Sequence, residues 1–270
     1  MDEAKVKKMV RDGYAKVAVS GGCGCGCGPQ CTSSAISKEL GYSEKDIGEV
    51  PEGANLGLGC GNPIALASLK KGEVVMDLGS GGGFDCFLAA SRVGKNGKVI
   101  GVDMTPEMLD RSRMNAKKGG YRNVEFRLGE IENLPAADNS VDVIISNCVI
   151  NLAPDKLRVF SEAFRVLKPG GRLMVSDIVI TRPLPEKVMG SVRAYVGCLS
   201  GAIMKDDYLK MIRSAGFRSP RVVGETQYPV SYMKNDESAK AIGKEAGLTE
   251  KELERLGASI LSIRVSAVKG

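Results

Sequence analysis

The chain contains no histidine and no tryptophan, and aromatic residues make up only 5% of its 270 residues. Histidine is the side chain that titrates near neutral pH, and its imidazole is the commonest metal ligand. Its absence excludes any mechanism that depends on an imidazole base and any metal site that depends on imidazole nitrogen. Acid–base or metal-binding chemistry in this chain must therefore come from other groups.

The sequence also lacks an apolar run of about 18 residues, the length that a membrane-spanning helix needs. Its first residues, MDEAK, lack the apolar core of a secretory signal peptide. Apolar residues still make up 43% of the chain, which is enough to bury a core. The formal net charge is only +6, without a concentrated basic arm. We therefore expect a globular cytoplasmic protein that acts on a small molecule rather than on nucleic acid or a membrane.

Cysteine is unusually frequent, with 8 in the chain. In a cytoplasmic enzyme such cysteines are more often ligands, nucleophiles or redox centres than a disulfide scaffold. Cys23, Cys25 and Cys27 alternate with glycine in the segment SGGCGCGCGPQC, which ends at Cys31. Glycine and proline disfavour a regular helix there, and the spacing typical of a zinc site is missing. This segment is either a soft-metal or redox loop or a tail without an essential role.

The chain is organised around residues 74–85, VVMDLGSGGGFD, where an apolar run breaks into glycines after Asp77. This pattern predicts a buried strand, a tight turn and the start of a helix. Glycine permits positive φ angles and lets the backbone approach a ligand closely. The dinucleotide fingerprint G-x-G-x-x-G would need its third glycine at Phe84. The observed spacing, D-x-G-x-G-x-G, resembles instead the first motif of class I S-adenosylmethionine-dependent methyltransferases.

Strand and helix patterns alternate from residue 74 onwards, which predicts an α/β fold with a parallel sheet wrapped by helices. Within the first of these helices, Cys86 is expected to fill core space. The expected strands are 74–78, 98–103, 123–128, 141–147, 171–179, 219–230 and, near the edge of the sheet, 260–269. The expected helices are 2–18, 32–47, 84–93, 106–118, 155–167, 205–215 and 237–257.

Ligands of open α/β sheets bind at the carboxyl ends of the strands, where the sequence places a coherent set of side chains. Asp103 ends the second strand about 20 residues past the glycines, a position from which a carboxylate binds both ribose hydroxyls. The alternative is that Asp103 serves only as a negative charge at a helix N-terminus. Met104, Ile131 and Glu132 are expected around the adenine, and Asn147 ends the fourth strand. The expected cofactor-binding residues are Asp77, Gly79, Ser80, Gly81, Gly83, Asp103, Met104, Ile131, Glu132 and Asn147.

Three segments carry a more specific resemblance: PEGANLGLGCGNP around Cys60, VMDLGSGGGFD at the glycine turn and SNCVINL around Cys148. Together with VIGVDMTPEML and LKPGGRL they resemble the arsenite methyltransferase family. The resemblance implies a class I fold with a Rossmann-like, mostly parallel seven-stranded sheet. It implies that S-adenosylmethionine methylates trivalent arsenic bound by Cys60, Cys148 and Cys198, a detoxification reaction. It also implies a redox role for an upstream cysteine, for which Cys31 is the nearest candidate.

The chemistry suits a chain without histidine. Trivalent arsenic is soft and binds three thiolates in a pyramid, which leaves a lone pair at the apex. The lone pair attacks the sulfonium methyl in line, so no proton has to leave the attacking atom. Methylation oxidises arsenic, and closure of a thiol pair to a disulfide would return it to the trivalent state. A thiol reductant such as glutathione or thioredoxin is therefore an expected partner, alongside arsenite, methylarsenite and their thiol conjugates.

We expect three parts along the chain. Residues 1–70 hold the N-terminal helix, the cysteine- and glycine-rich loop and a lid, and residues 71–180 hold the cofactor-binding core. Residues 181–270 hold the arsenic-binding insertion, at 181–204, and a C-terminal part that completes the sheet. Two alternatives remain open: a methyltransferase acting on carbon, oxygen or nitrogen of a small metabolite, and a thiol-rich metal-binding protein that uses the fold as a scaffold.

Overall fold

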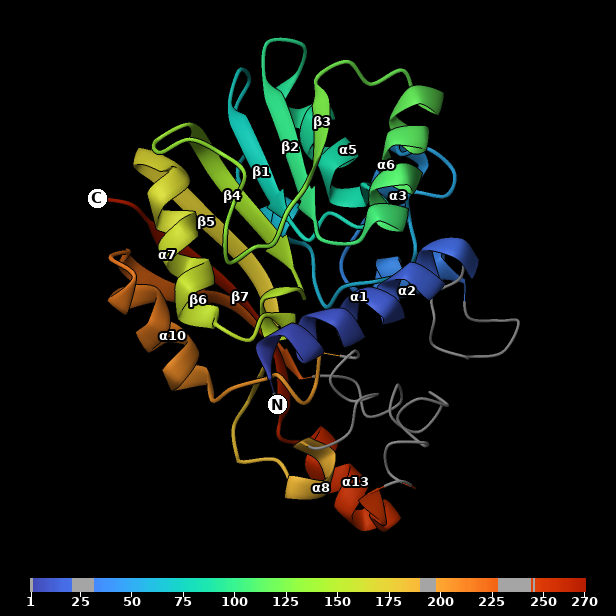
Figure 1. Cartoon of the computed structure of the whole chain (residues 1–270), viewed down its shortest axis with the longest axis vertical. Helices are drawn as coiled ribbons and strands as arrows, with labels where there is room; N and C mark the ends of the chain where they lie inside the picture. The colour runs from blue at the N-terminus through green and yellow to red at the C-terminus, as the bar shows by residue number, and fades with distance from the viewer. Residues whose placement is uncertain (1, 21–31, 190–197, 228–243, 245) are drawn as a thin grey trace.

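The computed structural model describes residues 2–20, 32–189, 198–227, 244 and 246–270. Its strands form a seven-stranded sheet in the order β3-β2-β1-β4-β5-β7-β6 (Figure 1). Strands β1 to β5 are parallel, and β7 runs antiparallel between β5 and β6. The expected mostly parallel sheet is therefore confirmed. The strands are β1 Val74–Leu78, β2 Lys98–Asp103, β3 Val124–Leu128, β4 Val141–Asn147, β5 Leu167–Ile180, β6 Arg218–Gln227 and β7 Ile260–Val268.

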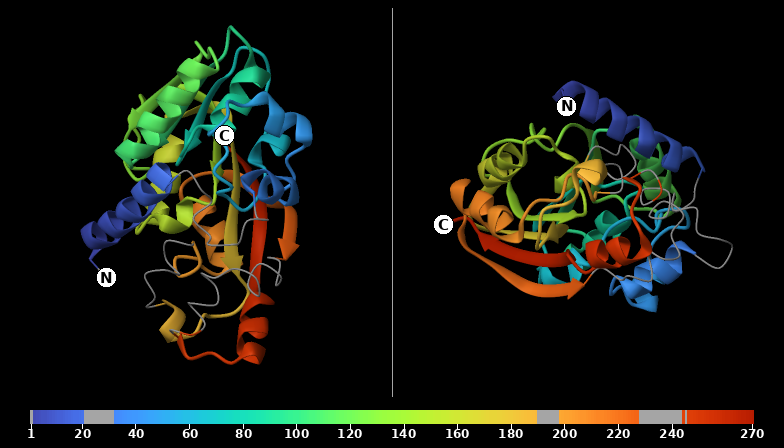
Figure 2. Two further views of the ribbon diagram at one scale, coloured as in Figure 1. Left: turned by 90° about the vertical axis from the view of Figure 1, so that its right-hand side faces the viewer. Right: turned by 90° about the horizontal axis from the view of Figure 1, so that it is seen from below.

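Helices pack on both faces of the sheet (Figure 2). Successive strand residues point to opposite faces, so Met76 of β1 packs on one side with Phe160 of α7 and Tyr208 of α10. Val75 packs on the other side with Phe87 of α5. The helices are α1 Glu3–Ser20, α2 Ser33–Glu39, α3 Glu44–Glu49, α4 Pro63–Leu66, α5 Phe84–Val93, α6 Pro106–Lys118, the 3₁₀ helix η1 Ile150–Leu152, α7 Lys156–Val166, α8 Glu186–Met189, α10 Lys205–Ser214 and α13 Glu250–Gly257.

The expected single helix over 32–47 is wrong, because two short helices occupy this range. Helix α2 ends before Gly41, whose φ of 94° does not continue a helix. Tyr42 then turns into the core, where it is 4% exposed, and Ser43 starts α3 with a capping box. The local helical spacing did not reveal this break, which serves to bury an aromatic side chain.

The C-terminal part departs from expectation in its helix and agrees with expectation in its strand. The expected helix over 237–257 lies partly outside the described residues, and Gly247, with a φ of 64°, separates α13 from the residues before it. The strand expected near the edge of the sheet over 260–269 is confirmed as β7, which lies next to the edge strand β6 and pairs antiparallel with both β6 and β5. Among the described residues, no helix combines the length and the apolar character that crossing a membrane would require.

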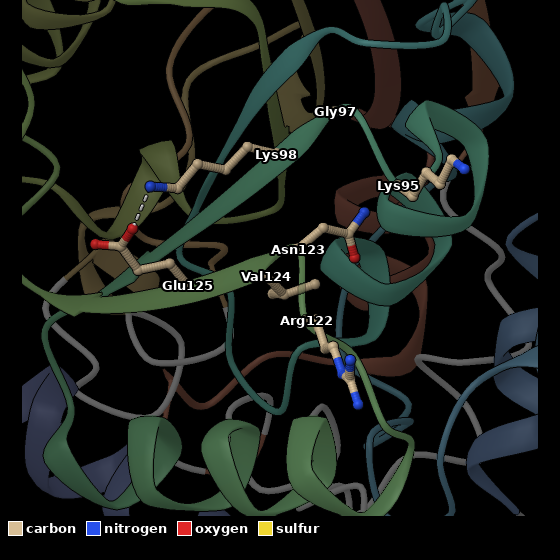
Figure 3. Close-up of a pocket in the computed structure, with 7 residues that line it drawn as sticks. All are labelled: Lys95, Gly97, Lys98, Arg122, Asn123, Val124 and Glu125. Atoms are coloured by element: carbon tan, nitrogen blue, oxygen red, sulfur yellow. Dashed lines mark ion pairs between the residues drawn. The ribbon is translucent and has the colours of Figure 1, made fainter.

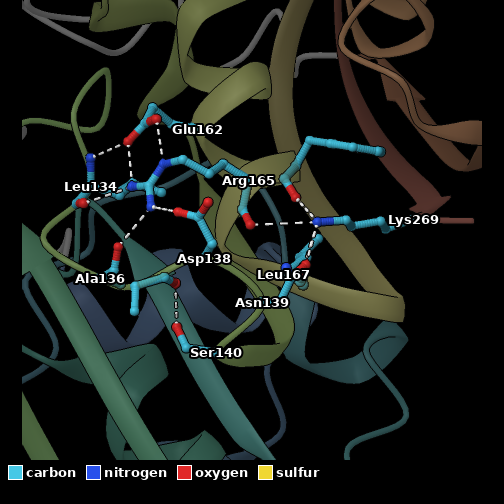
Figure 4. A network of polar contacts seen from close by, with 11 residues as sticks. Leu134, Ala136, Asp138, Asn139, Ser140, Glu162, Arg165, Leu167 and Lys269 are labelled. Atoms are coloured by element: carbon cyan, nitrogen blue, oxygen red, sulfur yellow. Dashed lines mark hydrogen bonds and ion pairs between the residues drawn. The ribbon is translucent and has the colours of Figure 1, made fainter.

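A network of polar contacts fixes the segment between β3 and β4 (Figure 4). Arg165 of α7 contacts the carboxylates of Glu162 and Asp138 and the carbonyl oxygens of Leu134 and Ala136. The Glu162 carboxylate in turn accepts a hydrogen bond of 2.8 Å from the backbone nitrogen of Leu134. The segment that carries Ile131 and Glu132 is therefore tied to α7.

Lys269, near the C-terminus, belongs to the same network and contributes to the stability of the fold. Its ammonium donates to the carbonyl oxygens of Phe164 and Leu167, at 2.6 and 2.7 Å, and to Asn139 Oδ1 at 2.8 Å. We expect Lys269→Met to lower the free energy of unfolding by about 2 kcal/mol, because it leaves carbonyl groups at the end of α7 without their charged donor. Urea unfolding of both proteins measures this, and an unchanged midpoint would contradict it.

Candidate active site

The glycine turn after β1 has the geometry that the sequence predicted. Gly79, Gly81 and Gly83 have φ angles of 69°, 50° and 92°, values that side chains with a Cβ rarely adopt. A Cβ at Gly79 would lie 2.4 Å from the Val149 side chain, whereas a Cβ at Gly81 would meet no atom within 4 Å. The turn is therefore packed closely at Gly79 and open at Gly81. This is the arrangement expected of a backbone that approaches a ligand closely.

The polar groups at this turn suit a cofactor such as S-adenosylmethionine. Ser80 Oγ is buried and has no hydrogen-bond partner among the described residues. One carboxylate oxygen of Asp103 accepts a hydrogen bond of 2.9 Å from the Gly81 nitrogen, and the other accepts one of 2.9 Å from the Thr105 nitrogen. Burial raises the pKa of Asp103, while these backbone donors oppose that shift. Asp103 therefore holds the glycine turn and also accepts from the N-cap residue of α6, Thr105, while its binding of the ribose hydroxyls stays a prediction.

Asp77 lies beneath the turn and is 3% exposed. Burial raises the pKa of its carboxyl group well above the ordinary value, and the nearby charge of Asp85 adds to the shift. The Cys86 thiol donates a hydrogen bond of 3.2 Å to Asp77 and is itself fully buried. The expectation that Cys86 fills core space is confirmed.

Asn147, at the end of β4, links the cofactor turn to the loop that carries Cys60. Its Oδ1 accepts from the backbone nitrogen of Cys60 at 3.0 Å, and its Nδ2 donates to the Gly61 carbonyl at 2.8 Å. The same Nδ2 lies 3.2 Å from a carboxylate oxygen of Asp85 and 3.0 Å from the Tyr42 hydroxyl. A Cβ at Gly59 would lie 2.7 Å from this amide, so the loop needs glycine there.

Tyr42 and Asp85 were not among the expected site residues. The Tyr42 hydroxyl donates to Asp85 Oδ1 at 2.7 Å, and burial raises the pKa of Asp85 to about 6, against the effect of its hydrogen bonds with Tyr42 and Asn147. A buried tyrosine needs a partner for its hydroxyl, and an aspartate in the first turn of α5 provides one. Their separation of 43 residues hid this pairing from the sequence analysis.

Cys60, Cys148 and Cys198 come together beyond the carboxyl ends of the strands, in one buried cluster with Ile178 and Leu152. The three thiols are free and are 4%, 9% and 4% exposed. Cys198 Sγ donates a hydrogen bond of 2.9 Å to the Cys148 carbonyl oxygen. Cys148 and Cys198 have φ angles of 59° and 63°, a strained backbone that is concentrated at functional sites.

Two of the thiols, those of Cys60 and Cys148, lie in surroundings that favour the protonated, neutral form. Hydrogen bonds with the Cys198 and Cys60 thiols, and then burial, raise the pKa of Cys148 well above its ordinary value. Burial likewise raises the pKa of the Cys60 thiol. A ligand that binds these sulfurs must therefore replace their protons.

Asp177 of β5 lies beside the thiols and was missed by the sequence analysis. The sulfur atoms of Cys60 and Cys148 and a carboxylate oxygen of Asp177 all lie within 4.8 Å of one another. Burial raises the pKa of Asp177 to about 7, against hydrogen bonds from the Ile178 nitrogen and the Tyr208 hydroxyl. An acidic residue inside a strand pattern gave no signal, because its partners come from distant parts of the chain.

Helix α1 runs across the carboxyl ends of the strands, below the sheet in Figure 1. Tyr14 of α1 packs on the thiol cluster, as does Met104 from the end of β2. Lys7 lies 2.7 Å from a carboxylate oxygen of Glu130 and 3.2 Å from one of Glu132. Glu132, which was expected near the adenine amino group, thus pairs with α1 here, while Ile131 belongs to the core and is 8% exposed.

Cys31 and the glycine-alternating cysteines Cys23, Cys25 and Cys27 lie outside the described residues.

A surface cavity of about 390 Å³ lies at the opposite end of the sheet, where β2 and β3 begin (Figure 3). Its cationic residues include Lys95 and Arg122, and Lys98 there pairs with Glu125 at 2.5 Å. This cavity is remote from the glycine turn and the thiols, so it is not the candidate active site.

Comparison with known proteins agrees with this geometry. The family described as methyltransferase domain matches residues 69–216. The arsenite methyltransferase of Halobacterium salinarum is 50% identical over 232 residues, which cover 82% of this chain and 59% of that protein. The human arsenite methyltransferase is 33% identical over 230 residues, which cover 82% of this chain and 60% of that protein. This chain therefore spans about three fifths of the length of these curated relatives.

A solved structure extends the likeness to three dimensions. The crystal structure of CrArsM, an arsenic(III) S-adenosylmethionine methyltransferase from Chlamydomonas reinhardtii, has a TM-score of 0.65 and 36% sequence identity. The match covers 87% of this chain and 73% of that chain. With its methyltransferase fold, its glycine turn and its three buried thiols, the chain belongs to the arsenic(III) S-adenosylmethionine methyltransferase family.

Proposed function

We propose that the protein is an arsenite methyltransferase, which transfers methyl groups from S-adenosylmethionine to trivalent arsenic bound by its own thiols. The observation that carries this proposal is the cluster of Cys60, Cys148 and Cys198 next to the glycine turn. A methyltransferase for carbon, oxygen or nitrogen has no need for three buried thiols at this place. The relatives named as arsenite methyltransferases support the same substrate.

Arsenite loading needs no net release of protons. Arsenite is As(OH)₃ near neutral pH, and each thiol that forms an As–S bond gives its proton to the departing hydroxide, which leaves as water. Three thiols therefore give a neutral tri-thiolate and three waters. Neutral thiols, as the raised pKa values of Cys60 and Cys148 require, are suitable reactants for this exchange.

The residues around the glycine turn have a geometric task in methyl transfer. We assign Asp77, Gly79, Ser80, Gly81, Gly83, Asp103, Met104, Ile131, Glu132 and Asn147 to the binding of S-adenosylmethionine, which supplies an electrophilic methyl group. Cys148 and Asn147 are consecutive at the end of β4, and Asn147 also holds the Cys60 loop. We infer that arsenic bound by these thiols presents its lone pair to the glycine turn, an arrangement that would favour in-line attack.

The return to trivalent arsenic needs two electrons. Bound S-adenosylmethionine would supply the methyl group, with an As–C bond replacing the carbon–sulfur bond, and this would leave arsenic formally pentavalent. Two thiols restore the trivalent state by closing to a disulfide, which an external thiol reductant such as glutathione or thioredoxin then reopens. We assign one of these thiols to Cys31. A cytoplasmic location is part of this proposal, because a reducing compartment keeps such thiols free.

The decisive experiment is to incubate the protein with arsenite, S-adenosylmethionine and a thiol, and to separate the arsenic species by chromatography. Methylated arsenicals should form only when all three components are present. Ser161→Ala, which changes an exposed hydroxyl on α7 far from the thiols, serves as a matched control for mutagenesis. Complete absence of methylarsenicals at every thiol concentration would refute the proposed function.

Asn147 should be needed for arsenite binding, because it holds the loop that carries Cys60. Asn147→Ala leaves the Cys60 nitrogen and the Gly61 carbonyl without partners, and one unsatisfied buried group costs about 1–3 kcal/mol. We expect arsenite affinity to fall at least about tenfold, since about 1.4 kcal/mol corresponds to that factor. Tyr42→Phe removes only one group of the same network and should have a smaller effect. Calorimetric titration with arsenite measures both variants, and equal affinities for Asn147→Ala and the unmodified protein would exclude this role.

A further inference from the structure

Asp177 has no part in the chemistry proposed above, yet it lies beside the Cys60 and Cys148 thiols. It is 1% exposed, and one of its oxygens lies within 4.8 Å of the sulfur atoms of both Cys60 and Cys148. Trivalent arsenic uses three thiolates and keeps a lone pair, so it has no use for a carboxylate ligand. A buried carboxylate beside two thiols suits a different class of ligand.

Divalent cations with a filled d shell, Zn²⁺ and Cd²⁺, bind thiolates and carboxylates in a tetrahedron. Zinc ligands lie at about 2.3 Å for sulfur and about 2.0–2.2 Å for oxygen, which places neighbouring ligand atoms roughly 3.5–3.8 Å apart. The atoms of Cys60, Cys148 and Asp177 lie within 4.8 Å of one another, so they need to close by only about 1 Å. All three are buried, and water can occupy the fourth position.

The surroundings of Asp177 hold it in a fixed orientation. Asn151 Nδ2 and the Ile178 nitrogen donate to Oδ1 at 2.9 Å each, and the Tyr208 hydroxyl donates to Oδ2 at 3.1 Å. Such outer hydrogen bonds are the usual way in which proteins orient a metal-binding carboxylate. Donors on both oxygens restrain rotation of the carboxylate, which keeps it beside the two sulfur atoms.

The local charge also suits a divalent ion. Two thiolates and one carboxylate around a divalent cation carry a net charge of minus one. Lys156, which is 8% exposed, can bring a compensating positive charge; burial lowers the pKa of its ammonium, and the nearby charge of Asp177 opposes that shift. Its ammonium is held by the carbonyl oxygens of Asn151 and Ala153, at 3.3 and 3.1 Å. A bound divalent cation would thus complete a neutral buried cluster, as a buried ionic site requires.

We propose that Cys60, Cys148 and Asp177 form a binding site for a tetrahedral thiophilic cation, Zn²⁺ or Cd²⁺, which excludes arsenite by taking two of its three thiols. The cation replaces the two thiol protons and any proton on Asp177, and no electrons are transferred. Arsenite and the divalent cation compete, because they share Cys60 and Cys148. They differ in the third ligand, which is Cys198 for arsenite and Asp177 for the cation.

The test measures the affinities of Cd²⁺ and of arsenite on the same variants. The full chain with Cys23, Cys25, Cys27 and Cys31 replaced by serine removes other thiols that would bind Cd²⁺. In this background Asp177→Asn, which keeps the shape of the side chain, should weaken Cd²⁺ binding at least about tenfold. Arsenite affinity should change less than about threefold. Cadmium–thiolate absorption in competition with a chelator reports the first quantity, and calorimetry reports the second.

Cys198→Ser is the opposite variant and should weaken arsenite binding while it leaves Cd²⁺ affinity within about threefold. Cadmium NMR of the background protein provides a measurement that needs no change at the site, and it should report two sulfur ligands. A signal typical of three sulfur ligands would overturn the proposal. Equal Cd²⁺ affinities with and without Asp177→Asn, or equal losses for both ligands, would overturn it as well.

Discussion

Cys148→Ser should abolish methyl transfer to both inorganic arsenite and monomethylated trivalent arsenic. A hydroxyl is a hard donor and does not replace a thiolate on arsenic. Cys148 is central in the cluster, because its thiol contacts both the Cys60 and the Cys198 thiols. Single-turnover transfer with both substrates measures the effect, with S-adenosylmethionine affinity by calorimetry as the control. Full activity of Cys148→Ser on both substrates would refute the three-thiolate site.

The other cysteines separate by role under the same assay. Cys198→Ser should resemble Cys148→Ser. Cys60→Ser should retain part of its activity on the monomethylated substrate, since that arsenic has only two ligand positions left for Cys148 and Cys198. Cys31→Ser should still bind arsenite and lose the later, reductive rounds, because its assigned task is the disulfide step. Identical behaviour of all four variants would remove the distinction between ligand and redox cysteines.

Asp103→Ala is expected to weaken S-adenosylmethionine binding at least about tenfold. Two charge-assisted hydrogen bonds to the ribose hydroxyls would be lost, at about 1.5–3 kcal/mol each before water compensates. The structure adds a second cause, because the same carboxylate accepts from the Gly81 and Thr105 nitrogens and so holds the glycine turn. Asp110→Ala removes an equal charge from the exposed face of α6 and is the matched control. Unchanged affinity in calorimetry would remove Asp103 from the site.

The parallel part of the sheet was predictable because its signals are local. The strand at 74–78 and the helix at 106–118 were each confirmed at both ends, since an apolar run next to glycine, or Pro106 after Thr105, marks a boundary within a few residues. The helix break at Gly41 was not predictable in this way. It depends on the burial of Tyr42 against Asp85, which is 43 residues away.

The same distinction between local signals and long-range contacts applies to the candidate site. Cys60, Cys148 and Cys198 were indicated by the resemblance of their segments to the arsenite methyltransferase family. The contacts of Asp177 with the thiols, and of Lys7 with Glu132, form only when distant segments come together in the fold. The spacing of residues along the chain does not predict such contacts. The site residues that were missed are therefore those whose partners are supplied by the tertiary fold.

The place of β7 in the sheet has a consequence for the newly made chain. Of the described strands β7 is the last to be synthesised, yet it inserts between β5 and β6. Ser262 of β7 also donates a hydrogen bond of 2.5 Å to the carbonyl oxygen of Cys60, which fixes the loop of one proposed arsenic ligand from the other end of the chain. A nascent chain on the ribosome therefore carries Cys60 before β7 is available to hold the Cys60 loop. Under the proposed function, the arsenic site therefore gains the support of β7 only after translation has passed residue 262.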